Sequence, residues 1–328
     1  MFAAWLFVSL AIGAGGTWCA RRYALRHRLL DAPGERRAHT VPTPRGGGIG
    51  IVLALLVAGV ALFPVIEAPT GFAAMLAGLL LVAIVGLIDD HRGLSPWVRL
   101  AVQGGASALL AWALWRQTGE PVFALAGFIL AMVLANVWNF MDGIDGIAAT
   151  QAALVAGACA WALDGTMAWW GWALVAATLG FLPFNFPKAR VFLGDVGSGA
   201  LGFALAALLM QSMIEARGVH RALWLLPPSA FLIDASLTLG GRVLRGERWW
   251  QPHALHAYQQ WARRLRTHVP VTAAYAAWTL LSIVATWKIS HAGLPMGGVL
   301  VSIAAWYTTG TGLWLLLQGH RNGKGVSR

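Results

Sequence analysis

The chain has 328 residues, of which 58% are hydrophobic and 11% are charged, and its formal net charge is +11. A soluble domain carries about twice this charged fraction, so the composition excludes a soluble protein and indicates a polytopic membrane protein. A positive net charge is then expected from the positive-inside bias and gives no reason to expect nucleic acid as a partner.

The apolar stretches predict the membrane spans, because a helix needs roughly 20 apolar residues to cross a bilayer. We predict an all-α protein with about eleven transmembrane helices in a single integral membrane domain over residues 1–328. The predicted spans are 2–19, 47–66, 71–88, 98–115, 121–138, 147–163, 168–184, 197–214, 222–241, 270–287 and 295–318.

The basic residues predict the orientation of these spans. Of the 24 Lys and Arg residues, 20 fall in alternate loops and in the C-terminal tail. The other four are Arg116, Arg217, Arg221 and Lys288. The positive-inside rule places the larger group in the cytoplasm, with the N-terminus in the periplasm and the C-terminus in the cytoplasm.

Five of the 13 acidic residues lie at the predicted cytoplasmic ends of apolar runs: Asp89, Asp90, Asp142, Asp145 and Asp195. Carboxylates are costly near a bilayer, so these positions are candidates for chemistry. Clustered carboxylates that face water commonly hold a hard cation such as Mg²⁺. The sequence therefore predicts an active site at the cytoplasmic face.

The first acidic segment is GLIDD, which ends at Asp90. Its adjacent carboxylates repel each other, which raises one pKa and suits either a general base or a metal ligand paired with a general base. The alternative is a polar helix end, with Ser95 and Pro96 starting the next helix.

The second segment, NVWNFMDGIDG, carries Asn136, Asn139, Asp142 and Asp145 at intervals of three. On a helix this spacing predicts an oblique polar stripe along one side. Mg²⁺ and phosphate oxygens would provide partners for such a stripe. The alternative is a hydrogen-bonded polar cluster between helices.

The third segment, FNFPKARVFLGDVGSG, contains Asp195 and Ser198 at the start of a predicted helix. Together with the free N–H groups of that helix they predict a site for phosphate and metal, to which Lys188 and Arg190 add positive charge. The alternative is a glycine-rich helix start that packs tightly against its neighbours.

Three further features lie outside these segments. Arg45, in PTPRGGG, is placed to grip an anionic head group, or it is ordinary positive-inside charge. His253 and His256 are placed to donate to a diphosphate, or their aromatic-rich segment is an interfacial anchor. Asp234, inside a span, is a functional candidate or a paired structural acid.

The segments PTPRGGG, GLIDD…GLS, NVWNFMDGIDG, FNFP…VFLGDVGS and HALHAYQ occur in this order within residues 36–258. Together they resemble the polyprenyl-phosphate N-acetylhexosamine-1-phosphate transferases, which include the bacterial phospho-MurNAc-pentapeptide translocase. The resemblance implies transfer of a sugar 1-phosphate from a UDP-N-acetylhexosamine to undecaprenyl phosphate, with release of UMP, at the bacterial inner membrane. It also implies a Mg²⁺ cofactor, with Mn²⁺ as an alternative, and it is compatible with a homodimer.

The resemblance assigns roles to matching residues of this sequence. Asn139 and Asp195 match the metal ligands of the family. The catalytic set that it implies is Asp89, Asp90, Asp142, Asp145, His253 and His256, with one member of the Asp89–Asp90 pair deprotonating the lipid phosphate. Asn185 and Phe192 match positions near the uridine, and Arg99 matches a basic position that is often Lys. With the residue-based candidates Arg45, Lys188, Arg190 and Asp234, they complete the substrate-binding set.

One departure concerns the histidine motif. The peptidoglycan translocase has a dense histidine run where this chain has HALHAYQ. This looks like the branch that initiates O-antigen or other surface polysaccharides. The competing hypothesis is an ion-coupled transporter, which would need ionisable residues near the bilayer midplane and an internal repeat. Only Asp234 is such an acid, and we find no repeat.

Overall fold

The computed structural model describes residues 1–31, 41–247 and 255–319. The helices in this part of the chain are α1 (Phe2–Arg26), α2 (Ile49–Leu62), α3 (Pro69–Arg92), α4 (Pro96–Thr118), α5 (Pro121–Phe140), α6 (Ile147–Ala162), α7 (Gly165–Asn185), α8 (Asp195–Glu215), α9 (Ser229–Leu244), α10 (Ala257–Leu265), α11 (Val269–His291) and α12 (Met296–Gly319). Two 3₁₀ helices, η1 (Phe63–Val65) and η2 (Gly218–Leu225), precede α3 and α9. Strand β1 (Leu30–Asp31) pairs antiparallel with β2 (Thr43–Pro44).

The helices confirm an all-α polytopic membrane protein. Among the described residues, seven helices are long and apolar enough to cross a membrane: α1, α3, α5, α7, α8, α11 and α12. The pair η2 and α9, bent by 70°, is an eighth candidate. Each of the eleven predicted spans coincides with a helix, but α2 and α6 are short and α4 is more polar. The number eleven and the orientation therefore stay predictions.

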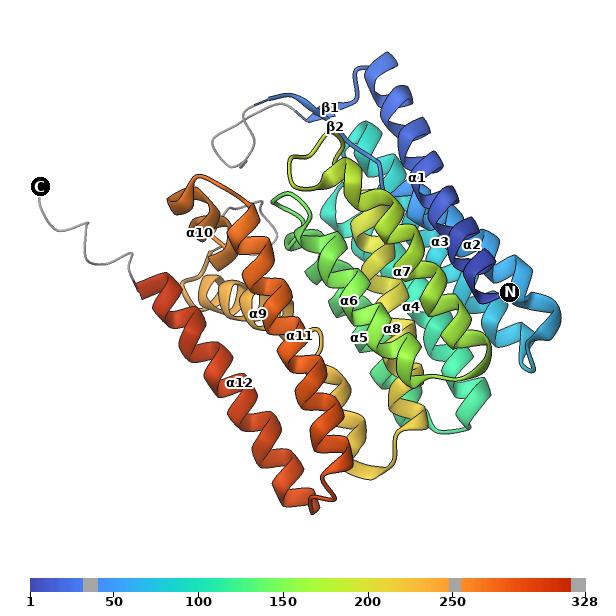
Figure 1. Cartoon of the computed structure of the whole chain (residues 1–328), viewed down its shortest axis with the longest axis vertical. Coiled ribbons are helices and arrows are strands. Elements are labelled where there is room, and N and C mark those ends of the chain that lie inside the picture. The colour runs from blue at the N-terminus through green and yellow to red at the C-terminus, as the bar shows by residue number, and fades with distance from the viewer. Residues whose placement is uncertain (32–40, 248–254, 320–328) are drawn as a thin grey trace, which may run out of the picture.

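Helix α8 lies at the centre of the bundle and is buried along nearly its whole length. Helices α3 and α5 pack closely against it, while α1 and α12 lie on opposite sides of the molecule (Figure 1). Small residues at the start of α8, such as Gly199, Ala200 and Gly202, allow this approach, because backbones come close where side chains are small. Asp195, the first residue of this central helix, therefore lies at one end of α8, with α3 and α5 packed beside the helix.

Helix α3 is longer than its apolar run, so both aspartates of GLIDD lie on its last turns rather than in a loop. Gly93, with φ 65°, ends the helix. The next helix starts as predicted, because Trp97 N–H donates to Ser95 Oγ at 3.3 Å and Pro96 occupies the first turn. The link between α3 and α4 is therefore only three residues long.

Helix α5 ends within the predicted polar stripe. It ends at Phe140, so the prediction of a continuous helical stripe is wrong beyond Asn139. Two glycines follow, and Gly146 adopts φ 74°, which favours glycine and interrupts helical geometry. Asp142 and Asp145 therefore lie on the turn between α5 and α6.

The PTPRGGG segment pairs with the segment that precedes α8. Gly47 N–H donates to Phe192 O at 2.9 Å, and Gly48 N–H donates to Leu193 O at 2.8 Å. The β1–β2 pair and α10 lie at the same end of the bundle (Figure 1). This end collects most of the segments that the sequence analysis singled out.

We expect Gly48→Ala to lower the melting temperature of the purified protein. An added Cβ would lie 2.3 Å from Gly197 Cα and 2.8 Å from Leu193 O, and overpacking of this kind typically costs about 1–3 kcal/mol. Differential scanning fluorimetry in detergent would measure the change. Gly105→Ala on α4 is the matched control, because its Cβ meets no atom within 4 Å. Equal melting temperatures for the two variants would contradict the close contact at Gly48.

Candidate active site

Three residues that the sequence singled out separately meet around the guanidinium group of Arg99. Its Nη1 lies 2.7 Å from Asp89 Oδ2 and 3.6 Å from Asp195 Oδ2. Its Nη2 donates to Asn139 Oδ1 at 3.4 Å. Helices α3, α4, α5 and α8 thus each contribute one polar group to the same point.

Asn139 and Asp195 are also in direct contact. Asn139 Nδ2 donates to Asp195 Oδ1 and, at 3.0 Å, to Ser198 Oγ. The Asp195 side chain is 32% exposed, so it keeps access to solvent and to a ligand. The two predicted metal ligands therefore lie side by side, each with a side-chain oxygen near Arg99.

Asp90 has a different environment from Asp89. It is 3% exposed, and its Oδ1 and Oδ2 accept hydrogen bonds from Asp195 N–H and Val196 N–H, both at 3.1 Å. These are the first two amides of α8, so Asp90 caps this helix from α3 and complements its dipole. The next two amides of α8 donate to Gly194 O. The prediction that free amides at this helix start bind phosphate is therefore wrong.

Asp142 stands in a region of excess negative charge. Burial raises the pKa of Asp142 well above its ordinary value, and the nearby charges of Asp195, Asp90 and Asp145 raise it further. A bound cation would oppose this repulsion. The surroundings of Asp142 thus fit a site that holds positive charge.

The oxygen atoms at this position also fit a small hard cation. Arg99, Gln103, Asn139 and Asp195 line a cavity of about 10 Å³, which is close to the size of one water molecule. Among the described residues no three His, Cys, Asp or Glu side chains converge as a metal site. Mg²⁺ is commonly held by one or two carboxylates, with waters and substrate phosphates as the other ligands. Asp195 and Asn139 therefore fit Mg²⁺ that is bound together with substrate.

Asp145 and Asn185 join the surrounding loops. Asp145 Oδ2 accepts from Ala189 N–H at 3.2 Å and lies 3.2 Å from His268 Nδ1. Asn185 Oδ1 accepts from Gly146 N–H, and its Nδ2 donates to Val191 O, both at 2.9 Å. Both side chains therefore hold the DGIDG turn against the segment that leads into α8.

The remaining predicted substrate-binding residues surround this centre unequally. Arg45 and Asp90 line one pocket of about 480 Å³ between α1, α2 and α3, and Arg45 Nε is buried without a hydrogen-bond partner among the described residues. Lys188 is exposed. Arg190 donates to Pro183 O and lies over the Phe184 ring, so the structure engages it with α7. Phe192 is half-buried between these segments.

The histidine segment reaches the site through aromatic contacts. His256 is 2% exposed and stacks on Phe140 and Tyr258, with ring centroids 6.5 and 5.8 Å away. Its Nδ1 lies 3.6 Å from Asp234 Oδ1. The second predicted histidine, His253, lies outside the described residues.

Two polar residues near the centre were absent from the predicted site. Gln103 lines the small cavity and accepts a hydrogen bond from Asn136 Nδ2 at 2.9 Å. It follows Arg99 by four residues on α4, so helical periodicity points to it. His268, the partner of Asp145, precedes α11 as a single histidine, and no sequence pattern marks it.

Comparison with known proteins identifies the family. The family model for glycosyl transferase family 4 matches residues 72–213. A decaprenyl-phosphate N-acetylglucosaminephosphotransferase of Mycolicibacterium smegmatis is 30% identical over 288 residues, covering 74% of this chain and 71% of the relative. A phospho-N-acetylmuramoyl-pentapeptide-transferase of Synechococcus elongatus is 29% identical over 334 residues, covering 86% of this chain and 87% of the relative. The chain belongs to glycosyl transferase family 4.

The matched region runs through α3 to α8 and so contains every residue that meets at Arg99. A third relative, a probable undecaprenyl-phosphate N-acetylglucosaminyl 1-phosphate transferase of Bacillus subtilis, is 29% identical over 211 residues, covering 60% of this chain and 58% of the relative. The resemblance that the sequence motifs indicated is thereby confirmed. In this family member Asp195 lies on α8, the most deeply buried of the candidate spans among the described residues, and Asp89 and Asp90 lie on α3.

Proposed function

We propose that this protein transfers N-acetylhexosamine 1-phosphate from a UDP-sugar to a polyprenyl phosphate and releases UMP. The observation that carries the proposal is the meeting of Asp89, Arg99, Asn139 and Asp195 at one point. Carboxylates beside a guanidinium group suit a reaction in which several phosphate groups and a metal come together. The names of the relatives, which include polyprenyl phosphate and N-acetylglucosamine, support the same reaction.

In this reaction an oxygen of the lipid phosphate attacks the β-phosphorus of the UDP-sugar. A new P–O bond forms, and the bond between the β-phosphorus and the bridging oxygen breaks, so that UMP leaves with that oxygen. The proton of the lipid phosphate passes to a carboxylate. Phosphoryl transfer depends mainly on positioning and electrostatics, which favours direct attack without an enzyme-bound intermediate.

The structure favours different roles for the two adjacent aspartates. Both oxygens of Asp90 accept from α8 amides, whereas Asp89 accepts from Leu94 N–H and from the side chain of Arg99. We therefore assign to Asp89 the role of accepting the proton of the lipid phosphate. Asp90 positions Asp195 by holding its backbone N–H. Arg99 is placed to move from the carboxylates to a substrate phosphate, for which its planar group is well suited.

Asn139 and Asp195 would hold Mg²⁺, with Mn²⁺ as an alternative. Such an ion would neutralise the diphosphate of the donor and the charge on departing UMP. Asp142 lies near enough to Asp195 for their charges to interact, and it would face the same region. His256 and His253 would contribute donors for the diphosphate, and Asn185 and Phe192 would shape the neighbouring uridine site.

The finer assignments follow from the charge pattern and from HALHAYQ. In this proposal the protein crosses the bacterial inner membrane about eleven times, with its N-terminus in the periplasm. The proposed site lies on the cytoplasmic face of that membrane. The acceptor is undecaprenyl phosphate, and the product starts an O-antigen or another surface polysaccharide. The ion-coupled transporter hypothesis loses its main support, because Asp234 is bonded to protein donors.

The test is UMP release by detergent-purified protein with Mg²⁺ and undecaprenyl phosphate, across a panel of UDP-N-acetylhexosamines. We expect release with at least one donor and loss of release with EDTA. Recovery after addition of Mg²⁺ would distinguish chelation from damage to the protein. No release from folded protein with any donor of the panel would overturn the proposed reaction.

A further inference from the structure

Asp234 on α9 is a buried acid that the proposed chemistry does not use. It is 1% exposed, and its two oxygens accept five hydrogen bonds. One donor, Thr238 Oγ1 at 3.1 Å, belongs to α9 itself. The other donors come from three different helices: Ala257 N–H at 2.9 Å, Tyr258 N–H at 3.1 Å, Tyr275 OH at 2.7 Å and Trp314 Nε1 at 3.1 Å.

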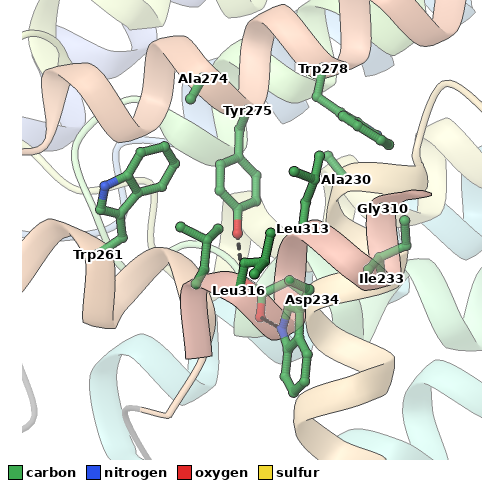
Figure 2. A pocket seen from close by; sticks show the side chains of 12 residues that line it. Ala230, Ile233, Asp234, Trp261, Ala274, Tyr275, Trp278, Gly310, Leu313 and Leu316 are labelled. Carbon is green, nitrogen blue, oxygen red and sulfur yellow. Dashed lines mark hydrogen bonds between the residues drawn. The ribbon is translucent and has the colours of Figure 1, made fainter. Parts of the chain in front are cut away.

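Figure 2 shows Tyr275 pointing toward Asp234 across an otherwise apolar cavity. The cavity has a volume of about 280 Å³ and is bounded by α9, α10, α11 and α12. Asp234 is therefore one polar group that contacts all four helices. A carboxylate is required here, because an amide in its place would have one acceptor oxygen and would direct N–H groups at other donors.

The backbone donors make Asp234 the cap of α10. Ala257 and Tyr258 are the first two residues of this helix, and its N-cap residue His256 makes no side-chain cap hydrogen bond. An orphan amide pair at a helix start is best satisfied by a negatively charged acceptor. The position of α10, and of His256 just before it, thus depends on a side chain from α9.

Tyr258 links the start of α10 to the candidate active site. Its hydroxyl donates to Phe140 O at 2.9 Å, at the end of α5. A Cβ on Gly143 would lie 2.2 Å from Tyr258 Oη, so the ring lies directly against the turn that holds Asp142. Burial, reinforced by the charges of Asp234 and Asp142, raises the pKa of Tyr258 well above its ordinary value, so the hydroxyl stays a donor.

We propose that Asp234 is a positioning residue of the transferase, which fixes the start of α10 and, through Tyr258, the turn that carries Asp142. The inference rests on the proposed function for its readout of turnover. Its structural part, the capping of α10 from α9, is measured independently. Asp234 accepts from protein donors of four helices and lies 3.6 Å from His256 Nδ1, so it acts through the residues that it holds.

The experiment compares Asp234→Asn, Tyr258→Phe and Thr238→Val in the full-length protein. Each is assayed for UMP release and for hydrogen exchange of the peptide that contains residues 256–262. For Asp234→Asn we expect kcat to fall about 10- to 100-fold, the scale of a misplaced group, with a smaller change in the KM for the UDP-sugar. Exchange of the α10 amides should become about tenfold faster, because the cap is weakened.

Tyr258→Phe keeps the backbone cap and removes the hydroxyl that contacts Phe140 O, the Gly143 backbone and the Gln259 side chain. We expect it to lower kcat while leaving the exchange of α10 unchanged. This result would separate the capping of α10 from the contact between Tyr258 and the turn that carries Asp142. This variant also tests the link if Asp234→Asn fails to fold. Thr238→Val is the matched control, because it removes a donor to Asp234 that lies on α9 itself. Its kcat and exchange should stay within about twofold of the parent protein, the scale of a minor contact.

Two outcomes would overturn the proposal. The first is unchanged α10 exchange in folded Asp234→Asn; if turnover is lost all the same, Asp234 contacts substrate instead of capping α10. The second is wild-type turnover in Tyr258→Phe. If the parent protein releases no UMP from any donor, the proposed function fails, whereas the exchange data still decide whether Asp234 caps α10.

Discussion

Asp195→Asn and Asn139→Ala are expected to lower the rate of UMP release about 100-fold or more, the scale of a lost electrostatic group in a catalytic site. Each change removes an oxygen ligand or its charge from the point where Asp89 and Arg99 also meet. The Mg²⁺ concentration for half-maximal activity should rise in both variants. Titration of Mg²⁺ in the UMP assay would measure this rise.

A matched control makes this prediction specific. Asp164→Asn is the matched control. Asp164 is an exposed acid in the α6–α7 link, at the opposite end of α6 from the α5–α6 turn. It should leave turnover and the Mg²⁺ requirement unchanged. Wild-type turnover in folded Asp195→Asn or Asn139→Ala would remove these residues from the metal site.

Asp89→Asn and Asp90→Asn are expected to separate chemistry from stability. Both should lower UMP release about 100-fold or more, because one removes the proposed proton acceptor and the other misplaces Asp195. Only Asp90→Asn should also lower the melting temperature strongly. A hydrogen bond to a charged group contributes about 1.5–3 kcal/mol, and Asp90 accepts two from α8 amides.

Differential scanning fluorimetry and the UMP assay, run on the same preparations, would check this separation. Asp89 accepts hydrogen bonds from Arg99 and from Leu94 N–H, and neither of these donors belongs to α8. Its replacement should therefore leave α8 in place. Equal loss of melting temperature in the two variants would contradict the assignment of Asp90 as the cap of α8. High activity in Asp89→Asn would mean that another carboxylate accepts the proton of the lipid phosphate.

The helices and the family were within reach of the sequence because both are encoded locally. Long apolar runs predict helices wherever they occur, and eleven such runs coincide with helices. The motifs around Asp89, Asn139 and Asp195 are short and contiguous, so they could be recognised without knowledge of the fold. Even the start of α4 at Ser95 was predictable, because capping depends on neighbouring residues.

The errors have the opposite origin, since they concern groups that find partners far along the chain. The amides at the start of α8 looked free until the fold brought Asp90, 105 residues away, to cap them. The polar stripe looked continuous because spacing alone does not show where α5 ends. Asp145 looked like part of that stripe, whereas its neighbours are His268 and the segment before α8.

Composition and motifs by themselves thus determined the class of protein, the helical segments and the polar residues that meet at Arg99, but they did not point to His268. Only the tertiary structure decided the partner of each polar group, including Arg99 between three side chains, Asp90 on α8 and Asp234 on α10. The physical reason is the range of the interactions. Hydrophobic periodicity and capping act within a few residues, whereas hydrogen bonds between buried groups form only after distant helices pack together.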